Sequence, residues 1–193
     1  MSCPTTNVAT IQIDGQAFDT TLEYFSFPLY HQIQDMEELA KLRLLSRLTS
    51  ANFFGTDLDD RGLQHVARVS TLDQLDLQET KITNDGLAHL AKLPLLSYLR
   101  LKDNRQLTND CIPHILRLTA LSNLQVHETS IDQAGLNQLA TLQNLRDICL
   151  YVEDDNYSFQ ALLELSARMP QCTILAKGRG EFRDGEFDGN WDR

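Results

Sequence analysis

Aliphatic residues recur along the chain at a fixed spacing. The string L-x-x-L-x-L occurs four times, at intervals of 24, 25 and 24 residues. The four strings are Leu72-Leu75-Leu77, Leu96-Leu99-Leu101, Leu121-Leu124-Val126 and Leu145-Ile148-Leu150. Self-similarity at a fixed period of this length indicates a chain built from stacked structural repeats.

Further steps of 24 residues extend this series in both directions. One step back from Leu72 reaches Leu48, and a second step reaches Tyr24. One step forward from Leu145 reaches Met169. We expect the repeat to continue in register at Leu48-Ala51-Phe53, Tyr24-Phe27-Leu29 and Met169-Cys172-Ile174.

The second half of each unit is also repeated. A small polar residue follows each string, at Thr56, Thr80, Asn104 and Thr129, and a helix-capping residue comes next, at Asp59, Thr83, Thr108 and Asp132. Side chains of the second kind accept hydrogen bonds from the free amides of a first helical turn. Aliphatic residues then recur every third position, as in Leu87, Leu90 and Leu93, which is one apolar face of a helix. Each unit therefore predicts a short strand, a turn and a helix of about three turns.

These units predict an α/β solenoid. A single unit cannot cover both of its apolar faces, whereas stacked units can, because each strand pairs with the next strand and each helix packs on its neighbour. The expected architecture is a short right-handed horseshoe, with a parallel sheet on the concave side and helices on the convex side.

The pattern resembles the leucine-rich repeat family in its helical, bacterial variety. The run L-x-x-L-x-L-x-x-T-x-I-T-N-x-G-L-x-x-L-x-x-L spans Leu72 to Leu93, and the resemblance covers about 48–174, more loosely from Tyr24 onward. Threonine replaces the usual asparagine after three of the strings, where a hydroxyl can still bond the backbone. The resemblance implies a protein-binding module, as in adaptors or inhibitors.

The two ends depart from the repeat, and we divide the chain into 1–47, 48–177 and 178–193. In the first part, alternation around Asp14-Gly15 predicts a hairpin, and Asp35 begins a helix of a first, atypical repeat. The last part contains Phe182, Phe187 and Trp191 among glycines and acids. It is either a capping hairpin or a flexible tail that docks on a partner or a second subunit.

Net charge and cysteine spacing limit the kinds of partner and cofactor that we expect. The net charge is -10 and the isoelectric point about 4.8, so we expect neither nucleic acid nor an anionic membrane as a partner. None of Cys3, Cys111, Cys149 and Cys172 forms a C-x-x-C pair, which leaves a zinc site without support, and we expect no cofactor or metal. The N-terminus lacks the features of a signal peptide, and no apolar run is long enough to span a bilayer. We expect a reduced, cytoplasmic protein.

Strand residues between the leucines predict the binding surface, because successive residues point to opposite sides of a sheet. Aromatic residues and arginine are enriched at binding hot spots. The candidate protein-binding residues on the concave face are Tyr98, Arg100, Lys102, His127, Tyr151, Asp76 and Gln125. The alternative is a structural or self-assembling subunit that uses its C-terminal tail or an end repeat.

Catalysis is not expected. Cys149 and His127 lie about one repeat apart, with Asp147 or Glu128 as a possible third group. A cysteine nucleophile needs a base and a site that excludes water, whereas these strands share an open sheet. The histidines at 65, 89 and 114 recur along the predicted helices, and we expect them to be solvated rather than bound to a metal.

Overall fold

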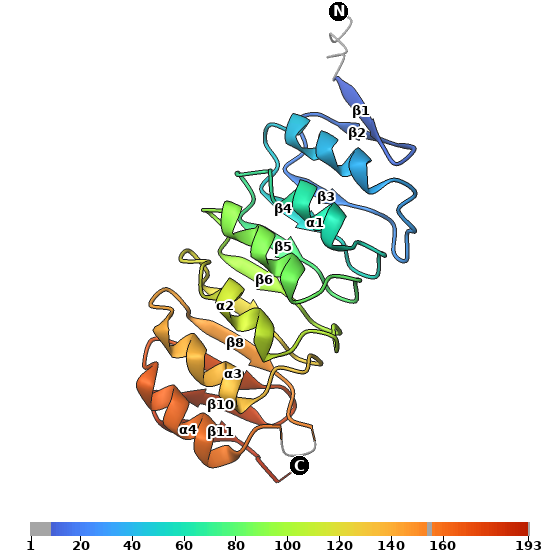
Figure 1. The fold of residues 1–193 in the computed structure, drawn as a ribbon. Coiled ribbons are helices and arrows are strands. Elements are labelled where there is room, and N and C mark those ends of the chain that lie inside the picture. Colours follow the sequence, from blue (N-terminus) through green and yellow to red (C-terminus); the bar gives the residue numbers. More distant parts are fainter. Residues whose placement is uncertain (1–8, 154–155, 193) are drawn as a thin grey trace, which may run out of the picture.

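A computed structural model of the chain describes residues 9–153 and 156–192, so Cys3 lies outside the described residues. The strands form one nine-stranded sheet in the order β11-β10-β9-β8-β7-β6-β5-β4-β3 and a separate hairpin, β1-β2 (Figure 1). The sheet strands are β3 (Tyr24–Ser26), β4 (Ser50–Asn52), β5 (Gln74–Asp76), β6 (Tyr98–Arg100), β7 (Asn123–Gln125), β8 (Asp147–Leu150), β9 (Thr173–Ala176), β10 (Gly180–Arg183) and β11 (Glu186–Gly189).

The central strands are parallel and in the register that the strings predict. Leu75 of β5 pairs with Leu99 of β6, Leu99 with Leu124 of β7, and Leu124 with Ile148 of β8. All four side chains are fully buried. The expected α/β leucine-rich repeat solenoid is therefore confirmed for the central units.

The first strand has a different register from the one that the 24-residue step predicts. Phe25 of β3 pairs with Ala51, so the first unit is two residues longer. Phe25 and Phe27 are buried, while Tyr24 and Leu29 are 50% and 55% exposed. The prediction that Tyr24 and Leu29 continue the buried string is wrong, because the alternation of side chains along the strand places Phe25 inside and Tyr24 outside.

The last parallel strand is shifted in the same way. Ile174 pairs with Ile148, which is 26 residues earlier, whereas the 24-residue step pairs Cys172 with Ile148. Met169, Cys172 and Ile174 are all fully buried, as expected, but their strand register is wrong by two residues. The additional residues lie between β8 and β9, in the longer connection that precedes α4 (Phe159–Arg168).

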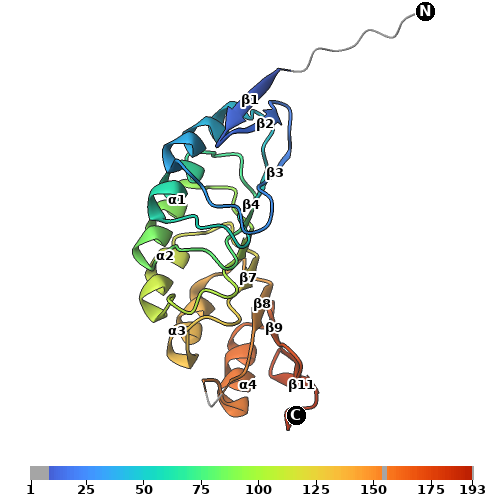
Figure 2. The same ribbon diagram turned by 90° about the vertical axis from the view of Figure 1, so that its right-hand side faces the viewer.

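The helical segments cover the outer side of a shallow arc, and the strands line its inner side (Figure 2). Many are short or 3₁₀-helical rather than the three-turn helices predicted. A period of three residues keeps the apolar side chains of a 3₁₀-helix on one face, which suits the spacing of Leu87, Leu90 and Leu93. Besides α4, the segments are η1 (Met36–Leu44), α1 (Asp60–Val66), η2 (Asp85–Lys92), η3 (Asn109–Cys111), α2 (Ile112–Ile115), α3 (Gln133–Gln138) and η4 (Leu139–Thr141).

Three of the four predicted capping residues cap a helix. Asp59 and Asp132 each accept hydrogen bonds from two backbone amides of the following turn, and Thr108 accepts one. Thr83 does not cap η2, whose N-cap is Asn84 without a side-chain bond. The hydroxyl of Thr83 instead donates to the carboxylate of Asp60 in the preceding repeat, at 2.7 Å. A capping position can therefore join neighbouring units.

The turn after each strand is closed by the small polar residue of the repeat. The hydroxyls of Thr56, Thr80 and Thr129 each donate to the carbonyl three residues earlier, at 2.8, 3.0 and 2.6 Å. Asn104 is fully buried, and its Nδ2 donates to Leu77 O at 2.8 Å. Threonine thus satisfies the turn within its own unit, whereas asparagine also reaches the preceding unit.

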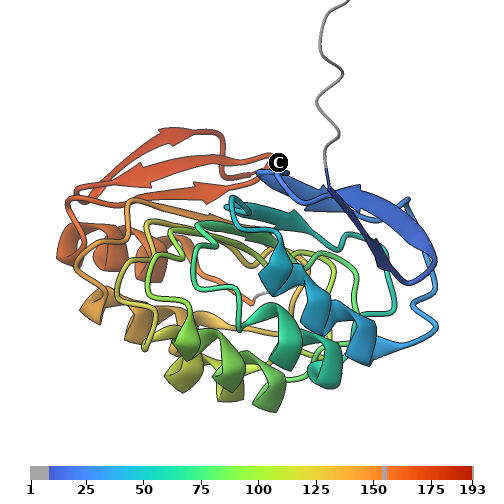
Figure 3. The same cartoon turned by 90° about the horizontal axis from the view of Figure 1, so that it is seen from above.

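Hairpins lie at both ends of the repeats. Strands β1 (Thr10–Ile13) and β2 (Gln16–Asp19) are antiparallel around Asp14-Gly15, and Phe18 packs 4.8 Å from Phe25 between ring centroids. At the other end, β10 and β11 form an antiparallel hairpin that extends the sheet from β9. Phe182 is fully buried against α4. Figure 3 shows the strands and the helical segments as two layers.

Candidate binding surface on the concave sheet

The strand register brings the predicted surface residues together on one face. Asp76, Arg100 and Gln125 pair directly across β5, β6 and β7, and Tyr98 lies on the same side of β6 as Arg100. Lys102, His127 and Tyr151 follow just beyond the carboxyl ends of β6, β7 and β8. The sequence therefore placed these side chains correctly relative to one another.

Cross-strand bonds fix the centre of this face. Nε2 of Gln125 donates to the phenol oxygen of Tyr98 at 2.8 Å. The Arg100 guanidinium lies 3.3 Å from the Asp76 carboxylate, and the Arg100 side chain is 30% exposed. Each bond joins neighbouring repeats, so these side chains are held in one arrangement before any partner arrives.

Lys102 belongs to a second group of charges at the carboxyl end of the strands. Its ammonium group lies 2.6 Å from Asp103 and 2.9 Å from Glu128, and its side chain is only 17% exposed. The hydrogen bond to Asp103 is the main reason that the pKa of Lys102 is raised. Because its charge is already paired, Lys102 offers less to a partner than the sequence suggested.

His127 is on the expected face but is almost completely covered, at 4% exposure. Burial lowers its pKa to about 4, and the positive charges of Lys177, Lys102 and Arg100 act in the same direction. The imidazole is therefore neutral at pH 7. Tyr151, by contrast, is 39% exposed, and it is the most accessible of the seven candidate residues.

A hollow of about 200 Å³ lies over β4 and β5 at the N-terminal half of the face. Tyr24 and Tyr98 flank it, and between them lie Ser50, Asn52, Gln74 and Asp76 together with the backbone of both strands. Tyr24 was not among the predicted surface residues, because the 24-residue step assigned it to the core. The alternation Tyr24-Phe25-Ser26-Phe27 is the signal that could have placed it outside.

Leu175 is a second residue of this face that was not among the candidates, which ended at Tyr151. It pairs with Cys149 across β8 and β9, and it is 36% exposed on the same face as the candidate residues. Ile174 is inside, as its place in the last string predicts, and Leu175 is therefore outside, because a shift of two residues leaves each side chain on its face. The concave face is thus wider than predicted, with exposed apolar side chains near both ends.

The arrangement does not suit cysteine catalysis. Burial raises the pKa of the Cys149 thiol, although Lys177 and Arg100 oppose this effect, and burial lowers the pKa of His127. A nucleophilic cysteine paired with histidine requires the opposite, a thiolate beside a protonated imidazole. Among the described residues, no three histidine, cysteine or acidic side chains are grouped to hold a metal ion.

One of the three outer histidines is not solvated as expected. His65 is 6% exposed, and its Nε2 lies 3.1 Å from the carboxylate of Glu37 on η1. His89 and His114 are partly exposed on their helical segments. His65 therefore packs one repeat against the previous one rather than facing solvent.

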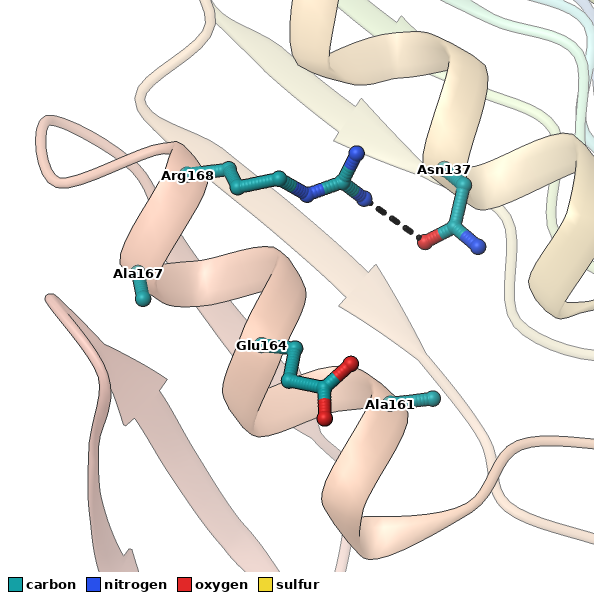
Figure 4. A pocket seen from close by; sticks show the side chains of 5 residues that line it. All are labelled: Asn137, Ala161, Glu164, Ala167 and Arg168. Carbon is teal, nitrogen blue, oxygen red and sulfur yellow. Dashed lines mark hydrogen bonds between the residues drawn. The ribbon is translucent and has the colours of Figure 1, made fainter.

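A separate hollow of about 580 Å³ lies between α3 and α4 on the helical side (Figure 4). Nη2 of Arg168 donates to Asn137 at 3.0 Å across it, and the small side chains of Ala161 and Ala167 leave the space open. None of the predicted site residues lines this hollow.

No helix in the described part of the chain has the length and apolar character needed to cross a membrane.

Comparison with known proteins supports a conclusion about the fold only. No protein-family model matches the sequence, and no curated protein is similar to it. An internalin from Listeria monocytogenes superposes with a TM-score of 0.50 at 15% identity, over 84% of this chain and 57% of the internalin. A leucine-rich repeat protein from Leptospira interrogans gives 0.46 at 18% identity, over 70% of this chain and 39% of that protein. The chain thus spans little more than half of the first structure. Its repeat register, its sheet and its likeness to the internalin show that this chain has the leucine-rich repeat fold.

Proposed function

We propose that the concave sheet face binds a protein partner. The observation that carries this proposal is the arrangement of exposed apolar side chains around a fixed polar centre. Tyr24, Tyr151 and Leu175 are 50%, 39% and 36% exposed on or beside this face, and the bonded pairs Tyr98–Gln125 and Arg100–Asp76 lie between them. Exposed aromatic residues beside fixed polar groups are typical of binding hot spots.

Preorganisation supports the same proposal. A partner that docks on this sheet orders few side chains, because cross-strand bonds already hold the central ones, and the entropic cost of binding is correspondingly smaller. An adaptor or inhibitor acts in this way, by presenting a rigid surface. The net charge of -10 favours a partner with a basic face over nucleic acid or an anionic membrane.

The end segments have a capping role in this proposal. Phe182, Phe187 and Trp191 pack around Phe159, with ring centroids 5.2–5.4 Å from it, so these side chains are engaged within the chain. This packing supports 178–193 as a cap more than as a free docking tail for self-assembly. Likewise, 1–47 contains the N-terminal cap hairpin and a first, atypical repeat, and 48–177 contains the leucine-rich repeats. The free cysteines Cys111, Cys149 and Cys172 suit a reducing, cytoplasmic location.

The test is affinity capture from a lysate of the source organism with matched variants. Tyr24→Glu and Leu175→Glu place a charge on the concave face at side chains that are already exposed, so we expect both variants to fold. Leu44→Glu, at a residue of η1 that is 51% exposed, makes the same change on the outer side. We expect one protein to be recovered with the wild type and with Leu44→Glu, and to be lost with both concave-face variants.

The opposite distribution would contradict the proposal. A partner that is retained by Tyr24→Glu and Leu175→Glu but lost with Leu44→Glu binds the helical side. Circular dichroism of each variant checks that a loss of binding does not come from unfolding.

A further inference from the structure

The sheet ends at β11, and within residues 9–153 and 156–192 no strand pairs with the outer side of β11. The amide of Asn190 donates to Arg179 O at 2.7 Å, which marks these two residues as a hydrogen-bonded pair. Hydrogen-bonded and non-bonded pairs alternate along antiparallel strands. Asp188 and Glu186 therefore bond inward to β10, while the amide and carbonyl groups of Phe187 and Gly189 point away from the sheet.

The side chains beside this edge carry a strong local charge. Phe182 and Phe187 turn toward α4, so the alternate residues of the hairpin face the concave side. A hollow of about 400 Å³ beside the hairpin is lined by Pro170, Glu181, Arg183, Asp184, Glu186, Phe187 and Asp188. Four of these seven residues are acidic and one is basic, which gives the lining a net charge of -3 at pH 7.

The acidic groups are not neutralised by neighbours. Glu181, Asp184, Glu186 and Asp188 are exposed, and none makes a side-chain hydrogen bond or ion pair within residues 9–153 and 156–192. The carboxylates near β11 therefore repel one another, and a cationic side chain beside them would relieve that repulsion.

The charge pattern decides which strand can pair with this edge. A second copy of β11 in antiparallel orientation brings Glu186 and Asp188 close to the same acids of its partner, and like charges across strands are destabilising. This charge also protects the edge from self-association. A basic segment meets the opposite situation, because its side chains can lie beside the four carboxylates.

We propose that the edge of β11 accepts an extended, basic segment of another protein as a tenth strand. The outward amide and carbonyl groups of Phe187 and Gly189 bond the backbone of the segment, and alternate lysine or arginine side chains lie beside Glu186 and Asp188. Addition of a strand to an open sheet edge is a general mode of peptide recognition. This edge site is separate from the concave face between β3 and β9, so a failure of one proposal does not affect the other.

The test uses three synthetic ten-residue peptides with the full-length protein. One alternates valine and lysine, the second alternates valine and glutamate, and the third is the valine-lysine peptide with methylated backbone nitrogens. We expect the first to bind at least tenfold more tightly than either of the others in a fluorescence anisotropy titration. In NMR hydrogen exchange, its binding slows the amides of Phe187 and Gly189 and leaves Asp188 unchanged.

A pair of protein variants provides the matched control. Glu186→Lys/Asp188→Lys is expected to lose binding of the valine-lysine peptide, whereas Asp85→Lys/Asp110→Lys has the same net charge and retains it. Three results would overturn the proposal: equal binding of the methylated peptide, equal binding of the glutamate peptide, or unchanged exchange of Phe187 and Gly189. The first would show that charge alone holds the peptide.

Discussion

The phenol oxygen of Tyr98 on β6 accepts a 2.8 Å hydrogen bond from the side-chain amide of Gln125 on β7. The two residues come from successive repeats, and Arg100 on the same strand reaches back to Asp76 on β5. The bonds therefore run in both directions along the stack and join three repeats at its centre. The concave face is consequently a fixed surface, and its stability depends on contacts between repeats.

Acid is expected to weaken the fold through His127. Burial and nearby positive charges lower the pKa of this histidine to about 4 in the folded protein, against about 6.5 in the unfolded chain. The unfolded state binds the proton first, so stability is lost as the pH falls from about 6.5 to 4. The loss is roughly 2–3 kcal/mol at 1.4 kcal/mol per pH unit. Urea denaturation across this range measures it.

His127→Gln is the control for this pH dependence. The variant retains a polar side chain that does not titrate, so its stability should fall less between pH 6.5 and 4 than that of the wild type. An NMR titration of His127 with a midpoint at or above 6.5 would contradict the structure.

Asn104 should contribute more to stability than the threonines that occupy the same position in other repeats. Its Nδ2, which has two hydrogens to donate, lies 2.8, 3.0 and 3.1 Å from the carbonyl oxygens of Leu77, Leu101 and Lys102. Removal of these bonds leaves buried acceptors unpaired, and we expect Asn104→Ala to cost about 3 kcal/mol. Thr129→Ala removes one bond to a carbonyl and should cost about 1 kcal/mol. Chemical denaturation that gives equal losses would refute this ranking.

Gly86 is expected to resist a substitution that normally stabilises helices. Alanine favours a helix over glycine by about 1 kcal/mol, but a Cβ at Gly86 would overlap the carboxylate of Asp60 in the preceding repeat. That carboxylate also accepts the amide of Thr83 at 2.8 Å, so it is not free to move. We predict that Gly86→Ala lowers the free energy of unfolding by about 1–3 kcal/mol.

A double-mutant cycle identifies the cause of that loss. Asp60→Ala removes the obstructing carboxylate, so Gly86→Ala should cost less in this background than in the wild type. Equal costs in the two backgrounds would mean that the Asp60 contact is not responsible.

Asp14 is expected to hold the N-terminal hairpin to the first repeat. Its carboxylate is 2% exposed, lies 2.6 Å from Nε2 of His31, and accepts the amides of Gln34 and Asp35 at 2.9 and 3.2 Å. Asp14→Ala should destabilise the protein by about 2 kcal/mol. Asp19→Ala, in the same hairpin, removes only local bonds from Thr21, so it should have a smaller effect. Thermal unfolding distinguishes the two, and equal shifts in Tm would be inconsistent with this role.

The sequence predicts the fold where the aliphatic strings recur at intervals of 24 or 25 residues. Between Leu72 and Leu150 the spacing of leucines alone sets the strand register, because each leucine must be buried on the same side of the sheet. At β3 and β9 two additional residues shift the strand pairing. The 24-residue step therefore assigned Tyr24 to the core, although its side chain is exposed. A fixed step does not allow for additional loop residues, and at β3 it is the alternation Tyr24-Phe25-Ser26-Phe27 that signals the shift.

The candidate site was predictable in position but not in exposure. Alternation along the strands placed Tyr98, Arg100 and His127 on one face, as the structure has them. Whether a side chain on that face is accessible depends on neighbours from other repeats. The carboxylates of Asp103 and Glu128 form ion pairs with the ammonium group of Lys102, and neighbouring residues cover His127. These contacts join residues some 25 positions apart, which single-strand patterns do not reveal.

Site-specific photo-crosslinking tests the concave-face proposal most directly. A photoreactive benzoylphenylalanine is placed at Tyr151, which is 39% exposed beside this face, and in a second protein at Leu44 on the outer side. After illumination in lysate, we predict that the variant at 151 forms a crosslink to one protein and the variant at 44 does not. A crosslink from position 44 alone would contradict the concave-face proposal and would place the binding surface on the helical side.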